Sequence, residues 1–190
     1  MAMRGIEERP AGLVLEPDLL AEGEETDLLH WCRGLVTEPV VMHGVASRRL
    51  VRHFGVDYDY ASWGTSDIEP VPARLLPVRD RAAALARVEA DSLVEALVTH
   101  YPAGAGIGWH RDATAFGPTV VGLSLGSDSV MRFQRRAAGG ARHVFEQPLP
   151  RRSAYVLAGQ ARSVWQHSVP PVAQERWSVT FRQLRRAPRA

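Results

Sequence analysis

Short stretches in which hydrophobic and polar side chains alternate follow one another through the second half of the chain. After Asp91 they are rich in β-branched and aromatic residues, and glycine and proline turns separate them. A period of two is typical of strands with one buried face. The expected strands are 93–101, 119–125, 129–134, 142–146, 153–158, 162–167 and 176–184. Regularly spaced short strands indicate a sandwich or barrel rather than alternating strands and helices.

The first ninety residues predict helices and fewer strands. Hydrophobic residues recur at helical spacing over 18–33, where Leu20, Leu28, Leu29 and Trp31 share a face, and again over 78–90. Short strands are expected at 13–15, 40–42 and 50–54, and an exposed loop at 61–77. Helices followed by seven or eight strands fit an α+β chain with a jelly-roll core and N-terminal helices packed on it.

Length and composition are those of a globular protein with one core. The chain has 190 residues, and 45% of them are hydrophobic. No apolar run approaches the roughly 18 residues that cross a bilayer, and residues 1–16 lack a signal-peptide stretch, so we expect a cytoplasmic protein without a membrane partner. The lone Cys32 excludes an internal disulfide and a multi-cysteine zinc site, and its neighbours place it on a buried helical face.

The charge is divided unevenly along the chain. Every cationic side chain is arginine; residues 1–129 hold 11 arginines and 19 acidic residues, whereas residues 130–190 hold 12 arginines and 2 acidic residues. A basic C-terminal half suggests an anionic partner such as nucleic acid, a phosphate or a carboxylate. An arginine-favouring genome, with the two halves paired by salt bridges, explains the same counts.

Two histidines and an aspartate are the candidate metal ligands. His110 and Asp112 lie two residues apart in an extended segment after a glycine-rich turn. Because side chains alternate along an extended chain, these two point the same way and can hold one ion together. His167 is the candidate third ligand, and two imidazoles with one carboxylate on a single face are typical of non-haem Fe(II) oxygenases. An isolated His-x-Asp also occurs in surface turns, so the argument depends on the segment after His167.

That segment, 176–184, carries a cationic face. From Arg176 to Arg182 the even positions are polar, and the odd positions are tryptophan, valine and phenylalanine. One face is therefore polar while the other packs in the core. A cationic face inside a small barrel needs an anionic partner, and a dicarboxylic acid such as 2-oxoglutarate fits because guanidinium groups bind carboxylates in bidentate fashion. The alternative is an edge strand whose arginines face water.

Together these motifs match a known family. They are His110-x-Asp112, Ser124-Leu125-Gly126, His167 and Arg176-x-Ser178-x-Thr180-Phe181-Arg182. From residue 50 to the C-terminus the chain resembles the AlkB family of Fe(II)/2-oxoglutarate-dependent dioxygenases. Within it, residues 49–60, 123–131, 150–153 and 165–167 are similar to the branch that contains eukaryotic tRNA wobble-uridine hydroxylases.

The resemblance implies a double-stranded β-helix fold and a reaction that uses Fe(II), 2-oxoglutarate and O2. His110, Asp112 and His167 would be the catalytic iron ligands. Residues 1–190 would form one oxygenase domain, with 1–90 as an N-terminal extension and substrate-recognition segment and 91–186 as the jelly-roll catalytic core.

The resemblance also implies how the cosubstrate is held. Tyr101 and Arg176 would bind the distal carboxylate of 2-oxoglutarate beside Ser178, and Arg182 would lie near the other carboxylate at the metal end. The family often has asparagine two residues before this tyrosine, where this chain has Thr99. One contact to the cosubstrate therefore differs.

Residues 43–66 combine arginines with aromatic side chains and are the expected substrate-recognition segment. Arginines can meet phosphates while aromatic rings stack on an unpaired or flipped base. The candidates for substrate binding are Arg49, Phe54, Tyr58, Tyr60 and Trp63. Phe54, Tyr58 and Tyr60 share one strand face, so the alternative is that they belong to the core.

The expected reaction is oxidative demethylation or hydroxylation of alkylated or modified bases in DNA or RNA, as in DNA repair, by a monomer. Several DNA-repair members of the family carry an acidic residue where this chain has Thr114, a further candidate substrate contact, which weakens the case for the usual N-methylated bases. The alternatives are the same chemistry on a small metabolite or protein side chain, and a non-catalytic jelly roll that only binds a ligand.

Overall fold

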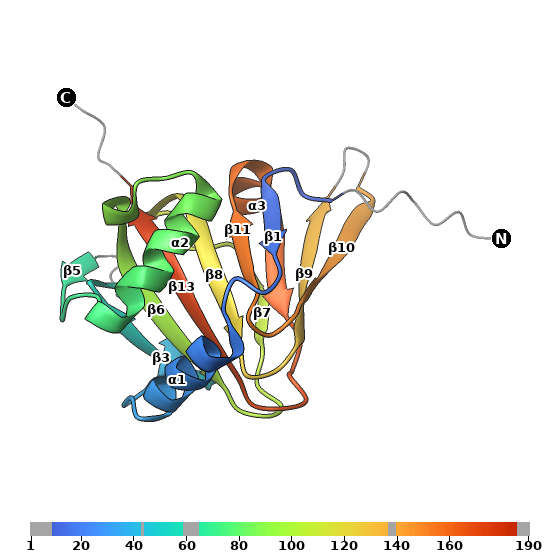
Figure 1. The fold of residues 1–190 in the computed structure, drawn as a ribbon. Helices are drawn as coiled ribbons and strands as arrows, with labels where there is room; N and C mark the ends of the chain where they lie inside the picture. Colours follow the sequence, from blue (N-terminus) through green and yellow to red (C-terminus); the bar gives the residue numbers. More distant parts are fainter. Residues whose placement is uncertain (1–8, 43, 59–64, 137–139, 186–190) are drawn as a thin grey trace.

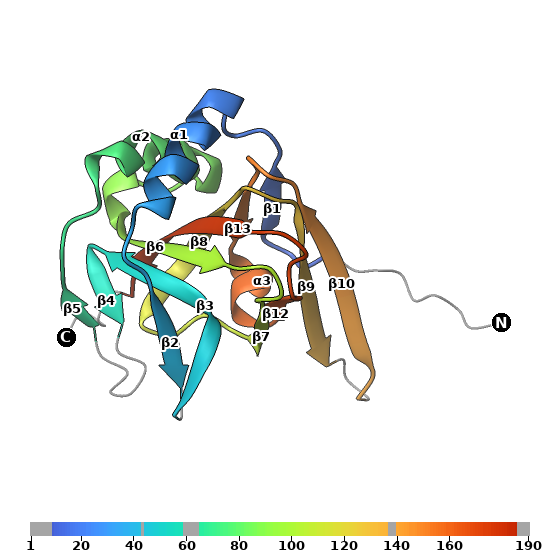
Figure 2. The ribbon, with the colours of Figure 1, turned by 90° about the horizontal axis from the view of Figure 1, so that it is seen from below.

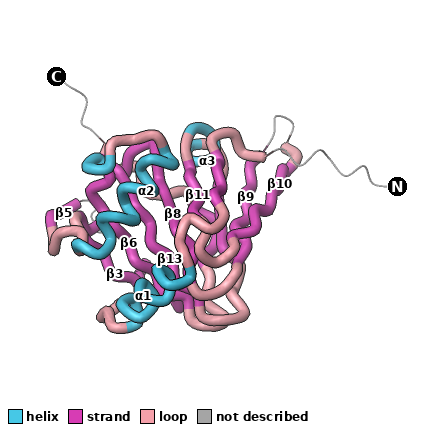
Figure 3. Tube along the Cα trace, viewed as in Figure 1, coloured by secondary structure: helices cyan, strands magenta, loops and turns pink. Residues whose placement is uncertain are grey.

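The computed structural model describes residues 9–42, 44–58, 65–136 and 140–185, and in these ranges two antiparallel sheets face each other (Figures 1 and 3). The larger sheet has the order β1 (Leu13–Glu16), β11 (Ala154–Leu157), β8 (Phe116–Leu125), β13 (Arg176–Leu184), β6 (Leu93–Tyr101), β3 (Val45–Phe54) and β2 (Glu38–Met42). The smaller has the order β10 (Arg142–Leu149), β9 (Ser129–Arg136), β12 (Gln166–Val169) and β7 (Ile107–His110). β4 (Val56–Tyr58) and β5 (Thr65–Asp67) form a separate ribbon.

Helices cover the outer face of the larger sheet. α1 (Glu22–Arg33) and α2 (Leu76–Ala86) lie side by side there (Figure 2). Leu28 and Cys32 of α1 and Ala82 of α2 share one hydrophobic cluster with the larger sheet. The two expected helices are therefore present, and their hydrophobic faces pack as the spacing predicted.

The alternation of β13 decides which side chains reach the space between the sheets. Trp177, Val179 and Phe181 are buried in the cluster under the helices. The polar side chains between them turn to the opposite face, as the sequence predicted. The inner face of the larger sheet is thus polar at β13 although it lies inside the sandwich.

Three sequence expectations about elements are corrected. The stretch 162–167 is not one strand, because the short helix α3 (Gly159–Ser163) ends there and β12 begins only at Gln166. The expected loop 61–77 contains β5, a 3-10 turn at Ala73–Leu75 and the start of α2. The helix expected to 90 ends at Ala86, because Arg87 adopts a left-handed φ of 56° and a second 3-10 turn follows at Ala90–Ser92.

Strands from both sides of residue 90 share the larger sheet. β1 pairs with β11, and β3 pairs with β6. The N-terminal part is therefore built into the sandwich rather than only laid upon it. Among the described helices, none has the length and apolar character needed to cross a membrane.

Candidate active site

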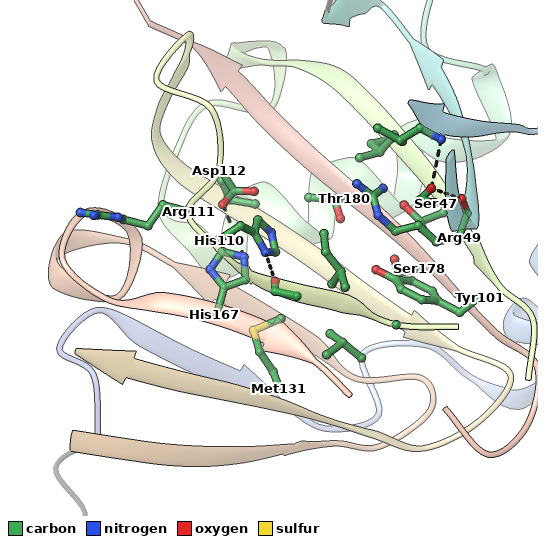
Figure 4. A pocket seen from close by; sticks show the side chains of 18 of the residues that line it. Ser47, Arg49, Tyr101, His110, Arg111, Asp112, Met131, His167, Ser178 and Thr180 are labelled. Atoms are coloured by element: carbon green, nitrogen blue, oxygen red, sulfur yellow. Dashed lines mark hydrogen bonds and ion pairs between the residues drawn. The ribbon is translucent and has the colours of Figure 1, made fainter. Parts of the chain in front are cut away.

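A cavity of about 580 Å³ lies between the two sheets. That volume is in the range of ligand pockets, which is about 300–1,000 Å³. Figure 4 shows His110, Asp112 and His167 at one end, and Tyr101 and Ser178 toward the other. The strands of both sheets therefore converge on a single space that holds most of the predicted site.

The three predicted metal ligands come together. His110 is the last residue of β7, Asp112 follows two residues later, and His167 on β12 pairs directly with His110. One ligand atom from each of the three side chains lies within 4.8 Å of the other two. Strand pairing therefore supplies the third ligand that spacing along the chain could only suggest.

The protonation states of His167 and Asp112 suit the binding of a cation. Burial lowers the pKa of His167 to about 4, against an opposite effect of Asp112, so its imidazole is neutral at pH 7. Burial raises the pKa of Asp112, but His167, Arg182, His110 and Arg162 lower it by more, and the carboxylate is ionised. A neutral imidazole and an ionised carboxylate are the forms that bind metal.

The donor set fits iron. Asp112 Oδ2 and His167 Nδ1 are buried without a hydrogen-bond partner, and Asp112 Oδ2 lies 3.9 Å from His167 Nε2. His110 Nδ1 lies 2.8 Å from the carbonyl oxygen of Gly108, which orients the ring and leaves Nε2 available to a metal. A buried carboxylate oxygen without a donor is costly unless a cation occupies the space beside it. Two imidazoles and one carboxylate match the facial arrangement for Fe(II).

Arg162 is a site residue that the sequence did not reveal. It lies on α3, is 9% exposed, and donates hydrogen bonds to the carbonyl oxygens of Asp112 (3.2 Å) and Ala113 (2.9 Å). Its Nε lies 3.9 Å from Asp112 Oδ2. Because 162–167 was expected as a strand, nothing indicated that this guanidinium would fix the loop that carries Asp112.

At the other end of the cavity, Arg176 is buried, and within the described ranges it has no carboxylate partner. It is 1% exposed, its Nε donates to Ser124 Oγ at 3.2 Å, and its guanidinium carbon lies 5.0 Å from the centre of the Tyr101 ring. Among the described residues no carboxylate lies within ion-pair distance. Ser178 is 4% exposed and lines the same cavity. An uncompensated buried cation is expensive, so this position suits an anionic ligand.

Arg182 differs from expectation, because it already has a carboxylate inside the protein. Glu95 lies opposite it on β6, is fully buried, and accepts two hydrogen bonds of 2.6 Å from the guanidinium. His53 Nδ1 lies 3.1 Å from the same carboxylate. Arg182 still lines the cavity. The signal that could have revealed Glu95 is that it is the one charged residue in the apolar run of β6.

The residues predicted to bind substrate do not all face the cavity. Arg49 on β3 is 8% exposed and lines the cavity. Phe54 on the same strand is five residues away, so it faces the other side, where it is 2% exposed and packs against Trp31 at 5.9 Å between ring centres. The stacking role predicted for Phe54 is therefore wrong, and the core alternative holds for that residue.

For the remaining substrate-binding candidates, the described part of the chain gives no contact with the cavity. Thr114 is exposed in a turn and does not line the cavity. The backbone of Tyr58 ends β4, where it pairs with Thr65. Tyr60 and Trp63 lie outside the described residues.

Comparison with known proteins finds sequence relatives for most of the chain. A sequence model of the 2OG-Fe(II) oxygenase superfamily matches residues 23–186. Among curated relatives, the tRNA (carboxymethyluridine(34)-5-O)-methyltransferase ALKBH8 of Mus musculus is 29% identical over 176 residues, which covers 88% of this chain and 25% of the relative. The alkylated DNA repair protein ALKBH8 homolog of Arabidopsis thaliana is 28% identical over 190 residues, covering 84% and 51%.

Solved structures share the fold. The structure of OsALKBH1 matches with a TM-score of 0.68 at 18% identity, over 93% of this chain and 98% of that one. A Pseudomonas putida prolyl-4-hydroxylase matches with a TM-score of 0.63 at 18% identity, over 92% and 93%. These matches confirm the expected jelly-roll architecture.

Proposed function

The chain belongs to the 2OG-Fe(II) oxygenase superfamily, and from that premise we propose that His110, Asp112 and His167 are its iron ligands. The protein is an AlkB-like dioxygenase that depends on Fe(II), 2-oxoglutarate and O2. The observation that carries the assignment of the ligands is their convergence, with ligand atoms within 4.8 Å of one another around an unpartnered buried carboxylate oxygen. Three protein ligands on one face leave metal positions open for cosubstrate and O2.

The chain's own residues would position the reactants. We assign the distal carboxylate of 2-oxoglutarate to Arg176 with Tyr101 and Ser178, because this guanidinium is buried and pairs with no carboxylate of the residues that the structure describes. Arg182 would lie at the metal end with its orientation fixed by Glu95. Bound iron and 2-oxoglutarate supply the oxidising chemistry, in which the cosubstrate is converted to succinate and CO2.

We propose that the substrate is an alkylated or otherwise modified base of DNA or RNA, which is demethylated or hydroxylated. The names of the relatives support this, since one concerns a modified tRNA uridine and another alkylated DNA repair. Arg49 enters the cavity from β3, in the segment expected to recognise the substrate. Under this proposal residues 1–190 act as one oxygenase domain, in which β2 and β3 border the substrate side of the cavity.

The decisive experiment measures succinate formation from 2-oxoglutarate with Fe(II), together with mass spectrometry of methylated oligonucleotides and tRNA digests for a 2-oxoglutarate-dependent product. His110→Ala should abolish both signals while the far-ultraviolet circular dichroism stays unchanged. Succinate formation that survives this substitution would remove His110 from the metal centre. The affinity for a nucleic-acid substrate should also fall strongly as the salt concentration rises. An affinity that does not change with salt concentration would favour a small-molecule substrate.

A further inference from the structure

Arg49 is a buried cation in the cavity, and no group in the described part of the chain neutralises it. It is 8% exposed, and among the described residues its guanidinium has no ion pair and no hydrogen-bond partner. Figure 4 shows the side chain extending from β3 into the cavity toward Thr180. Burial of an arginine in this state is costly unless a ligand brings a negative charge.

The hairpin of β2 and β3 holds this arginine in place. Ser47 Oγ donates a hydrogen bond of 2.6 Å to the carbonyl oxygen of Arg49 and accepts one of 3.1 Å from the backbone N–H of Val40. One hydroxyl therefore links both strands at the base of the side chain. The neighbouring Arg48 lies on the opposite face, is exposed, and rests against Gly104. The two adjacent arginines thus differ in burial and in direction.

The charges of the loaded cavity balance except at Arg49. Glu95 already neutralises Arg182. In the proposed complex, Asp112 and one carboxylate of 2-oxoglutarate offset the two charges of Fe(II), and the other carboxylate offsets Arg176. Histidine ligands bind a metal as neutral imidazoles and so add no charge to this balance. Counting only the described residues, Arg49 is the buried arginine of the cavity lining that keeps no counter-charge.

We propose that Arg49 binds an anionic oxygen group of the substrate, so that the enzyme selects a nucleotide with a negative charge close to the carbon that is oxidised. The shared chemistry is a carboxylate or phosphate, which the planar guanidinium binds with paired hydrogen bonds. The charge comes either from an acidic substituent on the base or from the phosphate of the same nucleotide. The inference rests on the proposed function, because the charge balance assumes bound Fe(II) and 2-oxoglutarate.

The test titrates protein loaded with Mn(II) and 2-oxoglutarate, in calorimetry, with two matched pairs of ligands. One pair is 5-carboxymethyluridine and its neutral amide, 5-carbamoylmethyluridine; the other is uridine 5′-monophosphate and uridine. The variants are Arg49→Gln, Arg49→Lys and the matched control Arg48→Gln, which loses the same charge on the outer face. Melting temperatures verify that each variant is folded.

We expect the wild type to bind the charged member of one pair at least about tenfold more tightly, because a hydrogen bond to a charged group contributes about 1.5–3 kcal/mol. Arg49→Gln should abolish that preference, Arg49→Lys should keep part of it, and Arg48→Gln should leave it unchanged. A preference within the first pair identifies a base substituent, and one within the second identifies a phosphate. Equal affinities within both pairs, no binding at all, or a preference that survives Arg49→Gln would overturn the inference.

The same titrations separate this inference from the proposed function. Wild type and Arg49→Gln should bind 2-oxoglutarate equally well in the presence of Mn(II). A tenfold loss in the variant would mean that the anion at Arg49 is the cosubstrate, which refutes the inference alone. Wild-type protein that does not bind 2-oxoglutarate with Mn(II) would refute the proposed function itself.

Discussion

At the scale of single residues, the cavity separates two kinds of buried arginine. Arg182 has an internal carboxylate in Glu95, whereas the partners described for Arg176 are Ser124 and the Tyr101 ring. A buried pair is strongly destabilised when one member is removed, while a buried cation without a counter-charge already costs folding energy. Breaking the Arg182–Glu95 pair should therefore lower the free energy of unfolding, whereas removing the charge of Arg176 should not.

Arg176→Gln should weaken 2-oxoglutarate binding without weakening the fold. We expect affinity to fall by about tenfold or more, since a charge-assisted hydrogen bond contributes about 1.5–3 kcal/mol. The free energy of unfolding without cosubstrate should stay level or rise, because a buried charge is removed. Calorimetry with Mn(II) and urea denaturation measure the two quantities, and unchanged affinity for 2-oxoglutarate would refute the assignment of Arg176.

Glu95→Gln should lower the free energy of unfolding by about 3–5 kcal/mol, the usual cost of breaking a buried ion pair from one side. The carboxylate is fully buried and holds both Arg182 and His53. The double variant Glu95→Leu with Arg182→Met removes both charges and should be less destabilised than the single variant. Urea denaturation of the wild type, the single variant and the double variant compares them, and a double variant at least as unstable as Glu95→Gln would contradict this account.

At the scale of elements, the turn between β3 and β4 depends on a residue without a side chain. Gly55 has a φ of +81°, and a Cβ there would lie 2.0 Å from the carbonyl oxygen of Val94. This close approach sets the turn that follows the strand of Arg49 against the backbone of β6. Backbone atoms cannot yield as the end of a side chain can, so the contact constrains the path of β3.

Gly55→Ala should therefore destabilise the protein more than an equivalent change elsewhere. Gly140 is the matched control, because its φ of +86° is similar but a Cβ would meet nothing within 4 Å. Gly140→Ala should cost about 1–2 kcal/mol for the left-handed backbone alone, and Gly55→Ala should cost more because a backbone clash is added. Urea midpoints of the two variants test this, and equal losses would show that the Val94 contact is easily relieved.

Element boundaries were predicted well where the pattern is local. The strands at 93–101 and 176–184 have the expected limits. The stretch 162–167 was wrong because α3 and β12 meet in it, and the short helix is fixed by the hydrogen bonds of Arg162 to the Asp112 loop rather than by its own pattern. Tertiary contacts overrode local propensity at that position.

At the scale of the whole molecule, internal ion pairs neutralise part of the uneven charge of the chain. Arg151 pairs with the fully buried Glu25, and Arg182 pairs with Glu95, so arginines of the C-terminal part meet carboxylates of the N-terminal part. Of the two interpretations drawn from the sequence, internal pairing is confirmed for these residues. If the proposed nucleic-acid substrate is right, its affinity should therefore depend on particular arginines such as Arg49 rather than on the total charge.

Removal of metal should lower global stability through linkage. A ligand at a hundred times its dissociation constant stabilises the folded state by about 2.7 kcal/mol. Mn(II) with 2-oxoglutarate should therefore raise the melting temperature, and EDTA should reverse the rise. Asp112→Asn serves as the comparison, because it removes the anionic ligand and should melt at the same temperature with and without metal. A metal-dependent rise that persists in this variant would place the ion elsewhere.

The sequence by itself determined which side chains share a face. Alternation along β13 directed Arg176 and Ser178 away from the core, and the spacing of His110 and Asp112 set them side by side, because these relations depend only on the local period of the backbone. The tertiary structure decided which groups meet across strands. Strand register joined Glu95 to Arg182 and His167 to His110, and packing of Trp31 against Phe54 made that face of β3 part of the core, while the opposite face with Arg49 lines the cavity. Such contacts link positions far apart in the chain, so the local pattern of either segment alone cannot predict them.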